Sequence, residues 1–485
     1  MNKTPNPLTR RKFLSLAGSS ALAVSLSGAN VIGANEKLRV GIIGGGIRSL
    51  TLTGQFWNLP GVEVAAICDP DKAQFASLIE RVKKRWDIDI SKVDYYQDYR
   101  KVYARKDIDI AVICAPNHWH TLMAIQAMEA GKDVYLEKPV THNIWEGAQL
   151  LAAEKKYGKV VAAGTQNRSD PGIINGFQYV REGNLGKILS IHACCFKNRS
   201  SIGDPLAKPL VPPKTMDYNL WLGPAQDLPI MRPSIHYDWH WIWNTGDGDI
   251  GNQAPHEIDM LCWLLGDPKL PNRISSFGGR FGWNDAGETP NMHTAWYVQN
   301  GVPCYIEVND LWLAPDRNSP SMRDKVRIGN VIRCEGGELR GGRGGMYAVG
   351  EDGKTTIQKF PGDSGKNHAQ NFIDAVRAGS SKGLRAPLKH SVKSAAIAHY
   401  ANVSHRAGGD AMEKRLRNQV KDDKILNTIL DEQSAQLKSW GIDKPKYTRG
   451  QVLRIDPKTG NLRNEGLESL VRPAYRGKFK VPELA

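Results

Sequence analysis

The sequence has few of the features that mark several classes of protein. Its seven cysteines are an odd number scattered over 485 residues, which excludes the paired framework of a small disulfide-rich protein. The apolar run at residues 13–34 is interrupted by Ser and Gly, and it is too broken for a membrane span of about 20 mostly apolar residues. Hydrophobic and charged fractions of 41% and 24% exclude a disordered or fibrous chain.

The excess of basic residues gives no clear sign of a nucleic-acid partner. Lys and Arg number 65 against 50 Asp and Glu, for a formal charge of +15. Such an excess indicates nucleic acid only where it is concentrated on one face or segment. Part of it lies in the first 12 residues, and more is spread through residues 406–485. We therefore expect no nucleic-acid partner.

Residues 1–36 have the pattern of a signal peptide. A basic start leads into the weakly apolar run, and Ser27-Gly28-Ala29 provides a small-residue cleavage site. The segment Thr9-Arg10-Arg11-Lys12-Phe13-Leu14 resembles the twin-arginine export signal. We therefore expect the twin-arginine translocase to export the protein already folded, with a cofactor bound, to a periplasmic or other extracytoplasmic location.

A dinucleotide-binding unit follows. Residues 37–43 form a β-branched run that ends in Gly44-Gly45-Gly46-Ile47-Arg48-Ser49, a G-x-G-x-x-S motif. The first glycine allows the tight turn, the second lets the backbone approach a pyrophosphate, and a small third residue packs helix on strand. Asp69 ends a second strand about twenty residues on, where it can accept hydrogen bonds from ribose hydroxyls. This carboxylate favours NAD, while Arg48 leaves NADP possible.

Strands and helices then alternate. Strands are expected at residues 108–114, 133–136 and 160–164, with helices at 117–130 and 143–157. This order predicts an α/β Rossmann domain, a doubly wound parallel sheet that binds ligands beyond the carboxyl ends of its strands. The expected cofactor contacts are Gly44, Gly46, Ile47, Arg48, Asp69, Pro116, Asn117, His120, Glu137, Lys138 and Gln166.

Two segments carry a family resemblance. Residues 115–120 (APNHWH) and 130–139 (AGKDVYLEKP) resemble the Gfo/Idh/MocA oxidoreductases, and the resemblance spans about residues 37–405. Its most specific element is Glu137-Lys138-Pro139 after a strand. Proline holds Lys138 in extended geometry. The resemblance implies that the Lys138 ammonium binds the hydroxyl being oxidised and stabilises its developing charge. The alternative is an exposed lysine in a turn.

The pattern changes after residue 166. A helix at 171–182 precedes a series of strands, expected at residues 187–196, 273–281, 293–299, 303–312, 331–340 and 355–360. Runs of strands indicate an α+β domain with an open, mostly antiparallel sheet. The resemblance implies that this sheet closes the active site and forms a homo-oligomer interface, and that a helix at 390–406 returns to the first domain. The expected divisions are 1–36, 37–166, 167–405 and an extension at 406–485.

One helix in the second domain carries candidate catalytic groups. Ile258 and the apolar residues after it give this helix a core face, and Asn252, His256 and Asp259 are expected opposite it, lining a cleft. In the family motif a histidine acts as general acid/base with an assisting aspartate, which implies that role for His256. Asn252 replaces the aspartate and cannot hold a proton, which weakens simple dehydrogenase chemistry. The candidate catalytic residues are Lys138, His256 and Asn252.

Aromatic and imidazole groups cluster upstream. Trp239, Trp241 and Trp243 are either plain core or flat faces for a pyranose ring. We take Trp239, Trp241 and Asp259 as candidate substrate contacts. His236, His240 and His256 lack the spacing of metal ligands, and no metal is expected.

The resemblance implies an NAD(P)-dependent oxidoreductase that holds its cofactor tightly and acts on a small carbohydrate. The alternative is an NAD-dependent glycoside hydrolase. In that reaction, transient oxidation of the sugar permits elimination, water addition and re-reduction without net redox. A sugar- or nucleotide-binding protein without activity is a third hypothesis, against which intact Lys138 and His256 argue.

Overall fold

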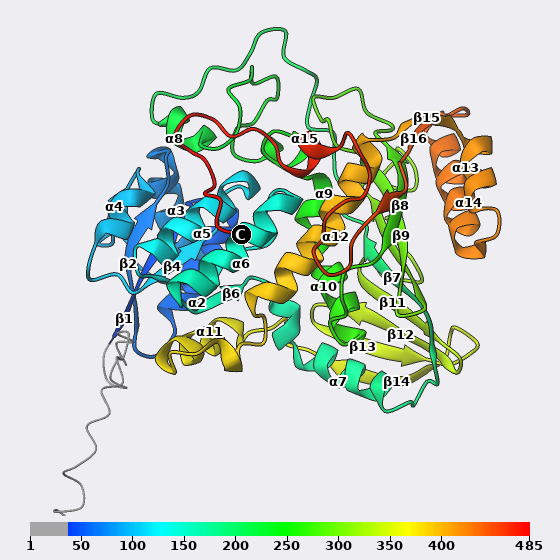
Figure 1. Ribbon diagram of the computed structural model, residues 1–485, viewed down its shortest axis with the longest axis horizontal. Helices are drawn as coiled ribbons and strands as arrows, with labels where there is room; N and C mark the ends of the chain where they lie inside the picture. The colour runs from blue at the N-terminus through cyan, green and yellow to red at the C-terminus, as the bar shows by residue number, and fades with distance from the viewer. Residues whose placement is uncertain (1–36) are drawn as a thin grey trace, which may run out of the picture.

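The computed structural model describes residues 37–485, so the expected export signal at residues 1–36 lies outside the described residues. Figure 1 shows two sheets with the long helix α12 (Leu388–Arg406) running between them. Within residues 37–485, no helix has both the length and the apolar character needed to cross a membrane. All seven cysteines are free thiols.

The first sheet is parallel and six-stranded, with order β3-β2-β1-β4-β5-β6, which confirms the predicted Rossmann architecture. Chain order reverses between β1 and β4, so a crevice opens beyond the carboxyl ends of these two strands. Its strands are β1 (Leu38–Ile43), β2 (Val62–Cys68), β3 (Asp94–Tyr96), β4 (Ile110–Ile113), β5 (Asp133–Leu136) and β6 (Val161–Ala163). Its helices are α2 (Ile47–Trp57), α3 (Ala73–Trp86), α4 (Tyr99–Ala104), η1 (Asn117–Trp119), α5 (His120–Glu129) and α6 (Ile144–Tyr157).

The second sheet is larger and mostly antiparallel, as expected. Its order is β14-β13-β12-β11-β7-β10-β9-β8-β16-β15, with β17 also paired to β8, and only β7 and β10 run parallel. The strands are β7 (Ile188–Cys195), β8 (Arg273–Gly279), β9 (Met292–Gln299), β10 (Val302–Asn309), β11 (Ile328–Cys334), β12 (Gly337–Gly342), β13 (Gly345–Val349), β14 (Thr356–Pro361), β15 (Gly409–Met412), β16 (Lys446–Arg449) and β17 (Leu453–Arg454).

One predicted strand is wrong. Residues 331–340 form parts of two antiparallel strands, β11 and β12, rather than one. The chain reverses at Glu335-Gly336, and Gly337 has a φ of +137° that a side chain rarely adopts. The turn occupies so few positions that the apolar pattern continues through it, and this is why the sequence reads as one strand.

Helices α7 (Pro171–Arg181), α10 (Pro255–Leu264) and α12 cover one face of the large sheet, and α12 also links the sheet to the first domain. Buried residues of α12 contact α6 of the first domain, and they also contact α10 and β8. The other helices after residue 165 are η2 (Gln166–Ser169), α8 (Tyr218–Leu222), η3 (Asp238–Trp241), α9 (Gly248–Asn252), α11 (His368–Arg377), η4 (Ser381–Gly383), α13 (Glu413–Val420), α14 (Lys424–Ser439) and α15 (Glu468–Val471). Of these, α11 packs into the core of the first domain, and α13 and α14 pack on the opposite face of the large sheet.

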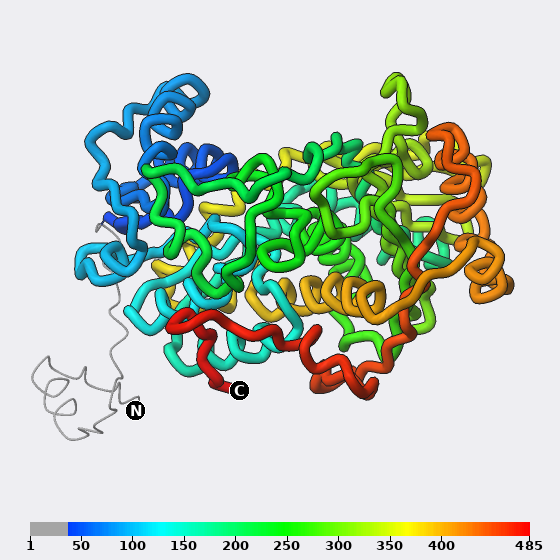
Figure 2. Tube along the Cα trace, turned by 90° about the horizontal axis from the view of Figure 1, so that it is seen from above, coloured from blue at the N-terminus to red at the C-terminus, as the bar shows by residue number. Residues whose placement is uncertain are grey.

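The last eighty residues contact both the first and the second domain. Strands β15 and β16 extend the large sheet, and α13 and α14 pack beside them. The final segment, residues 472–485, returns to the first domain and is called the C-terminal strap. Figures 1 and 2 show it in red beside the cyan helices. In the strap, Arg472 lies 3.9 Å from the Trp145 ring centre, and Phe479 meets Trp119 edge-on at 5.4 Å.

We predict that the strap stabilises the first domain through Phe479, which is 4% exposed. Phe479→Ala should lower the free energy of unfolding by about 3 kcal/mol, because it leaves a cavity beside Trp119. Chemical denaturation measures this change. The control is Val211→Ala at a side chain that is 81% exposed, which should change stability by less than about 0.5 kcal/mol. Equal stabilities for the two variants would show that the strap is only loosely attached.

Candidate active site

A cavity of about 500 Å³ opens where the first sheet predicts it. All of the expected cofactor contacts line it except Gln166. The second domain contributes the opposite wall, from Lys197, Tyr237, Trp239, His240, Asn252 and Arg343. We call this cavity the cleft. One side of the cleft is the nucleotide-binding edge of the first sheet, and the other is the polar and aromatic wall from the second domain.

The glycine-rich loop forms one end of the cleft. Gly44 has a φ of +113°, and a Cβ there would lie 2.6 Å from the carbonyl oxygen of Cys114. A Cβ on Gly46 would meet nothing within 4 Å, so space remains beside the N-terminus of α2. That N-terminus has no side-chain cap and is favourable for an anion. Loop and helix together fit the pyrophosphate of a dinucleotide.

Asp69 lies beside this loop. Its carboxylate accepts hydrogen bonds from the backbone N–H groups of Gly45 at 2.7 Å and Asp71 at 2.9 Å. Burial raises the pKa of Asp69 to about 6, although the two hydrogen bonds act in the opposite direction and lower it. Because each oxygen has a second lone pair, the carboxylate can still accept from ribose hydroxyls.

Arg48 does not lie at Asp69. Its Nη2 atom is 2.6 Å from Oε1 of Glu137, and its Nε atom donates to the same oxygen at 2.7 Å. Arg48, which the sequence offered as a partner for the 2′-phosphate of NADP, is therefore already paired with the buried carboxylate of Glu137. Gln166 donates to Glu137 Oε1 at 3.0 Å, so it positions Glu137 from behind the cleft wall. Burial favours the neutral form of Glu137, yet Arg48 and Lys138 hold its pKa below the usual value.

Lys138 projects across the cleft to the second domain. Its Nζ donates to the backbone oxygen of Asn252 at 2.6 Å, which places the ammonium at the C-terminal end of α9. Burial lowers the pKa of Lys138 to about 8, with Glu137 opposing the shift and three nearby cations adding to it. The ammonium is therefore a proton donor that titrates close to neutral pH.

His256 lies behind the cleft wall rather than in it. Its side chain is 4% exposed, and Nη2 of Arg343 lies 3.2 Å from its Nε2 atom. An arginine can only donate, so Nε2 carries the lone pair and Nδ1 the hydrogen. Burial, followed by the Arg343 charge, lowers the pKa of His256 well below its usual value. The ring is a neutral base covered by a guanidinium.

His240 lines the cleft directly, a position that sequence reasoning missed. Its Nδ1 contacts the backbone oxygen of Tyr237 at 2.5 Å, so Nδ1 carries the hydrogen and Nε2 the lone pair. Burial lowers the pKa of His240 to about 4, which keeps the ring neutral near pH 7. Trp239 stacks on the ring at 3.7 Å and also lines the cleft, as expected of a substrate contact. The sequence signal for this contact was the three-residue spacing between Tyr237 and His240, which places the ring near the Tyr237 backbone oxygen when the segment forms a short turn.

Two expected substrate contacts do not reach the cleft. Asp259 is fully buried in an ion pair with Arg168, whose Nε lies 2.7 Å from Oδ2. Trp241 is 4% exposed and points its Nε1 at Asp249. Asn252 ends α9, a separate helix from that of His256. The expected polar face of α10 is thus buried against η2, because Arg168 neutralises Asp259 there.

Lys197 and Arg343 were also missed. Both line the cleft from the large sheet, at the end of β7 and in the turn between β12 and β13. The glycines on both sides of Arg343 indicated an exposed turn, but they did not indicate that the turn faces the cleft. Within residues 37–485, no group of three or more His, Cys, Asp or Glu side chains is placed to hold a metal ion.

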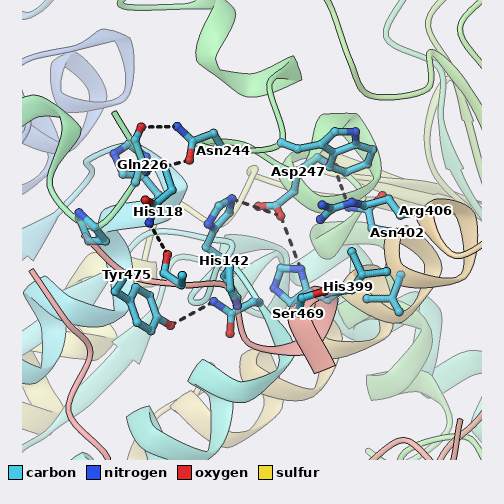
Figure 3. A pocket seen from close by; sticks show the side chains of 18 of the residues that line it. His118, His142, Gln226, Asn244, Asp247, His399, Asn402, Arg406, Ser469 and Tyr475 are labelled. Carbon is cyan, nitrogen blue, oxygen red and sulfur yellow. Dashed lines mark hydrogen bonds and ion pairs between the residues drawn. The ribbon is translucent and has the colours of Figure 1, made fainter. Parts of the chain in front are cut away.

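A second cavity, of about 300 Å³, lies behind the cleft and is shown in Figure 3. Its centre is Asp247, whose Oδ2 accepts from Asn117 Nδ2 at 2.9 Å. His142 and His399 lie on either side, each 3.7 Å from Oδ1. Asn402 donates to the Asp247 backbone oxygen at 2.9 Å. These contacts tie the loop before α9 to the first domain and to α12.

Comparison with known proteins agrees with this architecture. Residues 38–165 match the family model for the NAD-binding Rossmann fold of Gfo/Idh/MocA oxidoreductases. Residues 189–277 match the model for the C-terminal alpha/beta domain of the same family.

Two curated relatives illustrate the range of activities among similar proteins. An alpha-N-acetylgalactosaminidase from Shewanella oneidensis is 33% identical over 197 residues, covering 38% of this chain and 42% of the relative. A levoglucosan dehydrogenase from Pseudarthrobacter phenanthrenivorans is 25% identical over 249 residues, covering 50% and 54%. The matched region spans about half the length of these relatives.

Solved structures share the fold. The WlbA dehydrogenase from Bordetella pertussis, in complex with NADH and UDP-GlcNAcA, is 18% identical with a TM-score of 0.54. The alignment covers 75% of this chain and 93% of that one. The WlbA dehydrogenase from Chromobacterium violaceum, also in complex with NADH and UDP-GlcNAcA, has a TM-score of 0.55 at 18% identity, covering 76% of this chain and 94% of that one.

We predict that Gly44→Ala impairs NAD binding. The backbone strain at φ +113° costs about 1–3 kcal/mol, and the Cβ would also collide with Cys114. The dissociation constant for NAD, measured by calorimetry, should rise about tenfold or more. Gly383→Ala is the matched control, because a Cβ there meets nothing within 4 Å. Unchanged NAD affinity in Gly44→Ala would contradict a cofactor site at this loop.

Proposed function

Because the chain belongs to the Gfo/Idh/MocA oxidoreductase family, we propose that it binds NAD in the cleft and oxidises a hydroxyl of a sugar or sugar derivative. The observation that carries this proposal is the meeting of Lys138 and His240 in one cavity with the glycine-rich loop. Gly44, Gly46, Asp69 and the N-terminus of α2 would hold the dinucleotide. Bound NAD supplies the hydride acceptor.

The chain's own residues manage the hydroxyl proton. The Lys138 ammonium donates to the hydroxyl oxygen and stabilises the negative charge that develops on it. His240 is neutral, with a lone pair on Nε2, and takes the proton. His256, the residue expected from sequence, reaches a substrate only if Arg343 moves away from its Nε2 atom. His240 therefore replaces His256 as the proton acceptor in our proposal.

A second candidate function is glycoside hydrolysis without net redox. It is favoured by the glycosidase among the relatives and by an extra proton donor in the cleft. The Tyr237 hydroxyl accepts from Arg199 at 3.0 Å, so its own hydrogen remains available to a leaving group. After oxidation of one carbon, His240 would pass the hydroxyl proton to solvent. Its free Nε2 would then remove the acidified proton from the next carbon, and Tyr237 would protonate the departing oxygen.

A single assay separates the two functions. Purified enzyme, its NAD content determined after denaturation, is mixed with free sugars and p-nitrophenyl glycosides without added cofactor. Cofactor reduction that stops after one turnover supports the oxidoreductase, and sustained nitrophenol release supports the hydrolase. Neither signal over a broad panel, or full activity in Lys138→Ala, would overturn the proposal.

We also propose that the twin-arginine translocase exports the protein folded and that it acts outside the cytoplasm as a homo-oligomer. The Arg10-Arg11 pair and the small-residue site support export. An extracytoplasmic enzyme would need to retain and recycle its NAD, since no free pool is available there. Cell fractionation of the wild type and of an Arg10→Lys, Arg11→Lys variant tests the location, and size-exclusion chromatography tests the assembly.

We predict that activity declines at alkaline pH as Lys138 loses its proton. Its pKa is lowered to about 8, so the ammonium is present below that pH and is lost above it. His240 is neutral above about pH 5, so its titration does not change the rate near pH 7. The pH profile of kcat/KM should therefore be flat to about pH 8 and then fall tenfold per unit. In Lys138→Arg the rate should be lower but the alkaline fall absent; a persisting fall would assign it to another group.

A further inference from the structure

The part of the cleft beyond Lys138 holds two cations that no carboxylate in the described part of the chain contacts directly. Lys197 and Arg343 line this part, and within residues 37–485 neither forms an ion pair with an acidic side chain. Arg343 contacts the neutral His256 ring and makes long contacts to Asn167 at 3.4 Å and Gln166 at 3.5 Å. These contacts engage Nε and Nη2, so within residues 37–485 the two N–H donors of Nη1 remain without a protein acceptor.

Other charges near this region are already balanced. Arg48 is paired with Glu137, and Arg199 is paired with Asp249 at 2.7 Å. Glu257 is buried behind the wall, where burial raises its pKa to about 7 although the charges of Arg343 and Lys197 oppose the shift. Among residues 37–485, the only acidic side chains that line the cleft are Asp69, beside the glycine-rich loop, and Glu137. Lys138, Lys197 and Arg343 thus leave an excess of positive charge where a substrate would lie.

The fold holds Arg343 at this place by its backbone. The turn between β12 and β13 is glycine-rich, and the N–H of Gly344 donates to Oδ2 of Asp170 at 2.8 Å. Ser364 donates to the same oxygen at 2.9 Å. Asp170 is fully buried at the start of α7 and directly follows η2. An anchored turn that ends in an unpaired guanidinium is suited to a negative ligand group.

The dinucleotide does not account for these cations. Its phosphates fit at the glycine-rich loop and the N-terminus of α2. Arg343 instead lies against η2 and His256 of α10, and Lys197 follows β7 of the large sheet. The charge therefore belongs to the substrate half of the cleft.

We infer that the sugar substrate carries an anionic group, which Arg343 and Lys197 bind. This inference rests on the proposed function and narrows its substrate class to acidic sugars. A planar carboxylate, as in a uronic acid, matches the paired donors of a guanidinium, and a sulfate or phosphate ester presents the same charge.

The test compares matched acidic and neutral sugars. Binding of glucuronate against glucose and of galacturonate against galactose is measured by calorimetry on the NAD-loaded enzyme. Turnover is measured for p-nitrophenyl glucuronides and galacturonides against the corresponding glucosides and galactosides, with glucose 6-sulfate and glucose 6-phosphate as further arms. We expect the preferred acidic sugar to bind about tenfold or more tightly than its neutral partner.

Two variants assign the preference to the two cations. Arg343→Gln and Lys197→Gln should each reduce the acidic-to-neutral ratio of kcat/KM about tenfold, mainly through KM for the acidic sugar. Lys197→Gln does not alter a contact to His256, which separates charge recognition from effects on that ring. Lys354→Gln, in the exposed turn before β14, is the control for an equal change in net charge and should keep the wild-type ratio.

The outcomes distinguish the two hypotheses. Preference for a carboxylate, sulfate or phosphate that both variants reduce supports the inference and identifies the group. Neutral sugars bound or turned over as well as their acidic partners would overturn the inference while leaving the proposed function intact. Absence of bound NAD and of any turnover, by contrast, would count against the proposed function itself.

Discussion

The Asp247 carboxylate holds the two domains in register around the cleft. The carboxylate accepts a hydrogen bond from Asn117 in the turn after β4. The backbone oxygen of Asp247 accepts a second hydrogen bond, from the side chain of Asn402 on α12. Residues 248–252 follow immediately, so the position of α9 depends on this attachment. A Cβ on Gly251 would lie 2.1 Å from that of Asp247, which shows how closely the Asp247 side chain packs on α9, the helix that it precedes. Since Lys138 donates to the last backbone oxygen of α9, the same attachment sets the distance between the two walls.

The parallel sheet and most of its ligand edge could be predicted from the sequence, because each signal was local. A β-branched run that ends in glycines and an acid that ends the next strand identify positions along one edge. All the strands of that edge run in the same direction, so their ends meet. Glu137-Lys138-Pro139 belongs to this edge as well, and Lys138 lies in the cleft.

The opposite wall could not be predicted, because it depends on contacts between distant segments. A helical period places Asp259 on the same side of α10 as His256, but it does not reveal that Arg168, distant in sequence, is buried against it. Arg343 illustrates the same limit, since its turn reaches the cleft only because Asp170 binds the backbone of Gly344. His240 was assessed only as a metal ligand. The proposal that it acts as a neutral base depends on one contact, from its Nδ1 to the backbone oxygen of Tyr237.

The charges of the cleft make acid–base chemistry depend on what is bound. Without a ligand, burial and the cations around Lys138 favour its neutral amine, which is why its pKa is lowered to about 8. An anionic group on Arg343 and Lys197 would offset part of this repulsion and raise the pKa of Lys138. The ammonium would then stay protonated in the complex at a pH where the free enzyme has begun to lose it. A single anion would thus strengthen both substrate binding and the proton donor that faces the reacting hydroxyl.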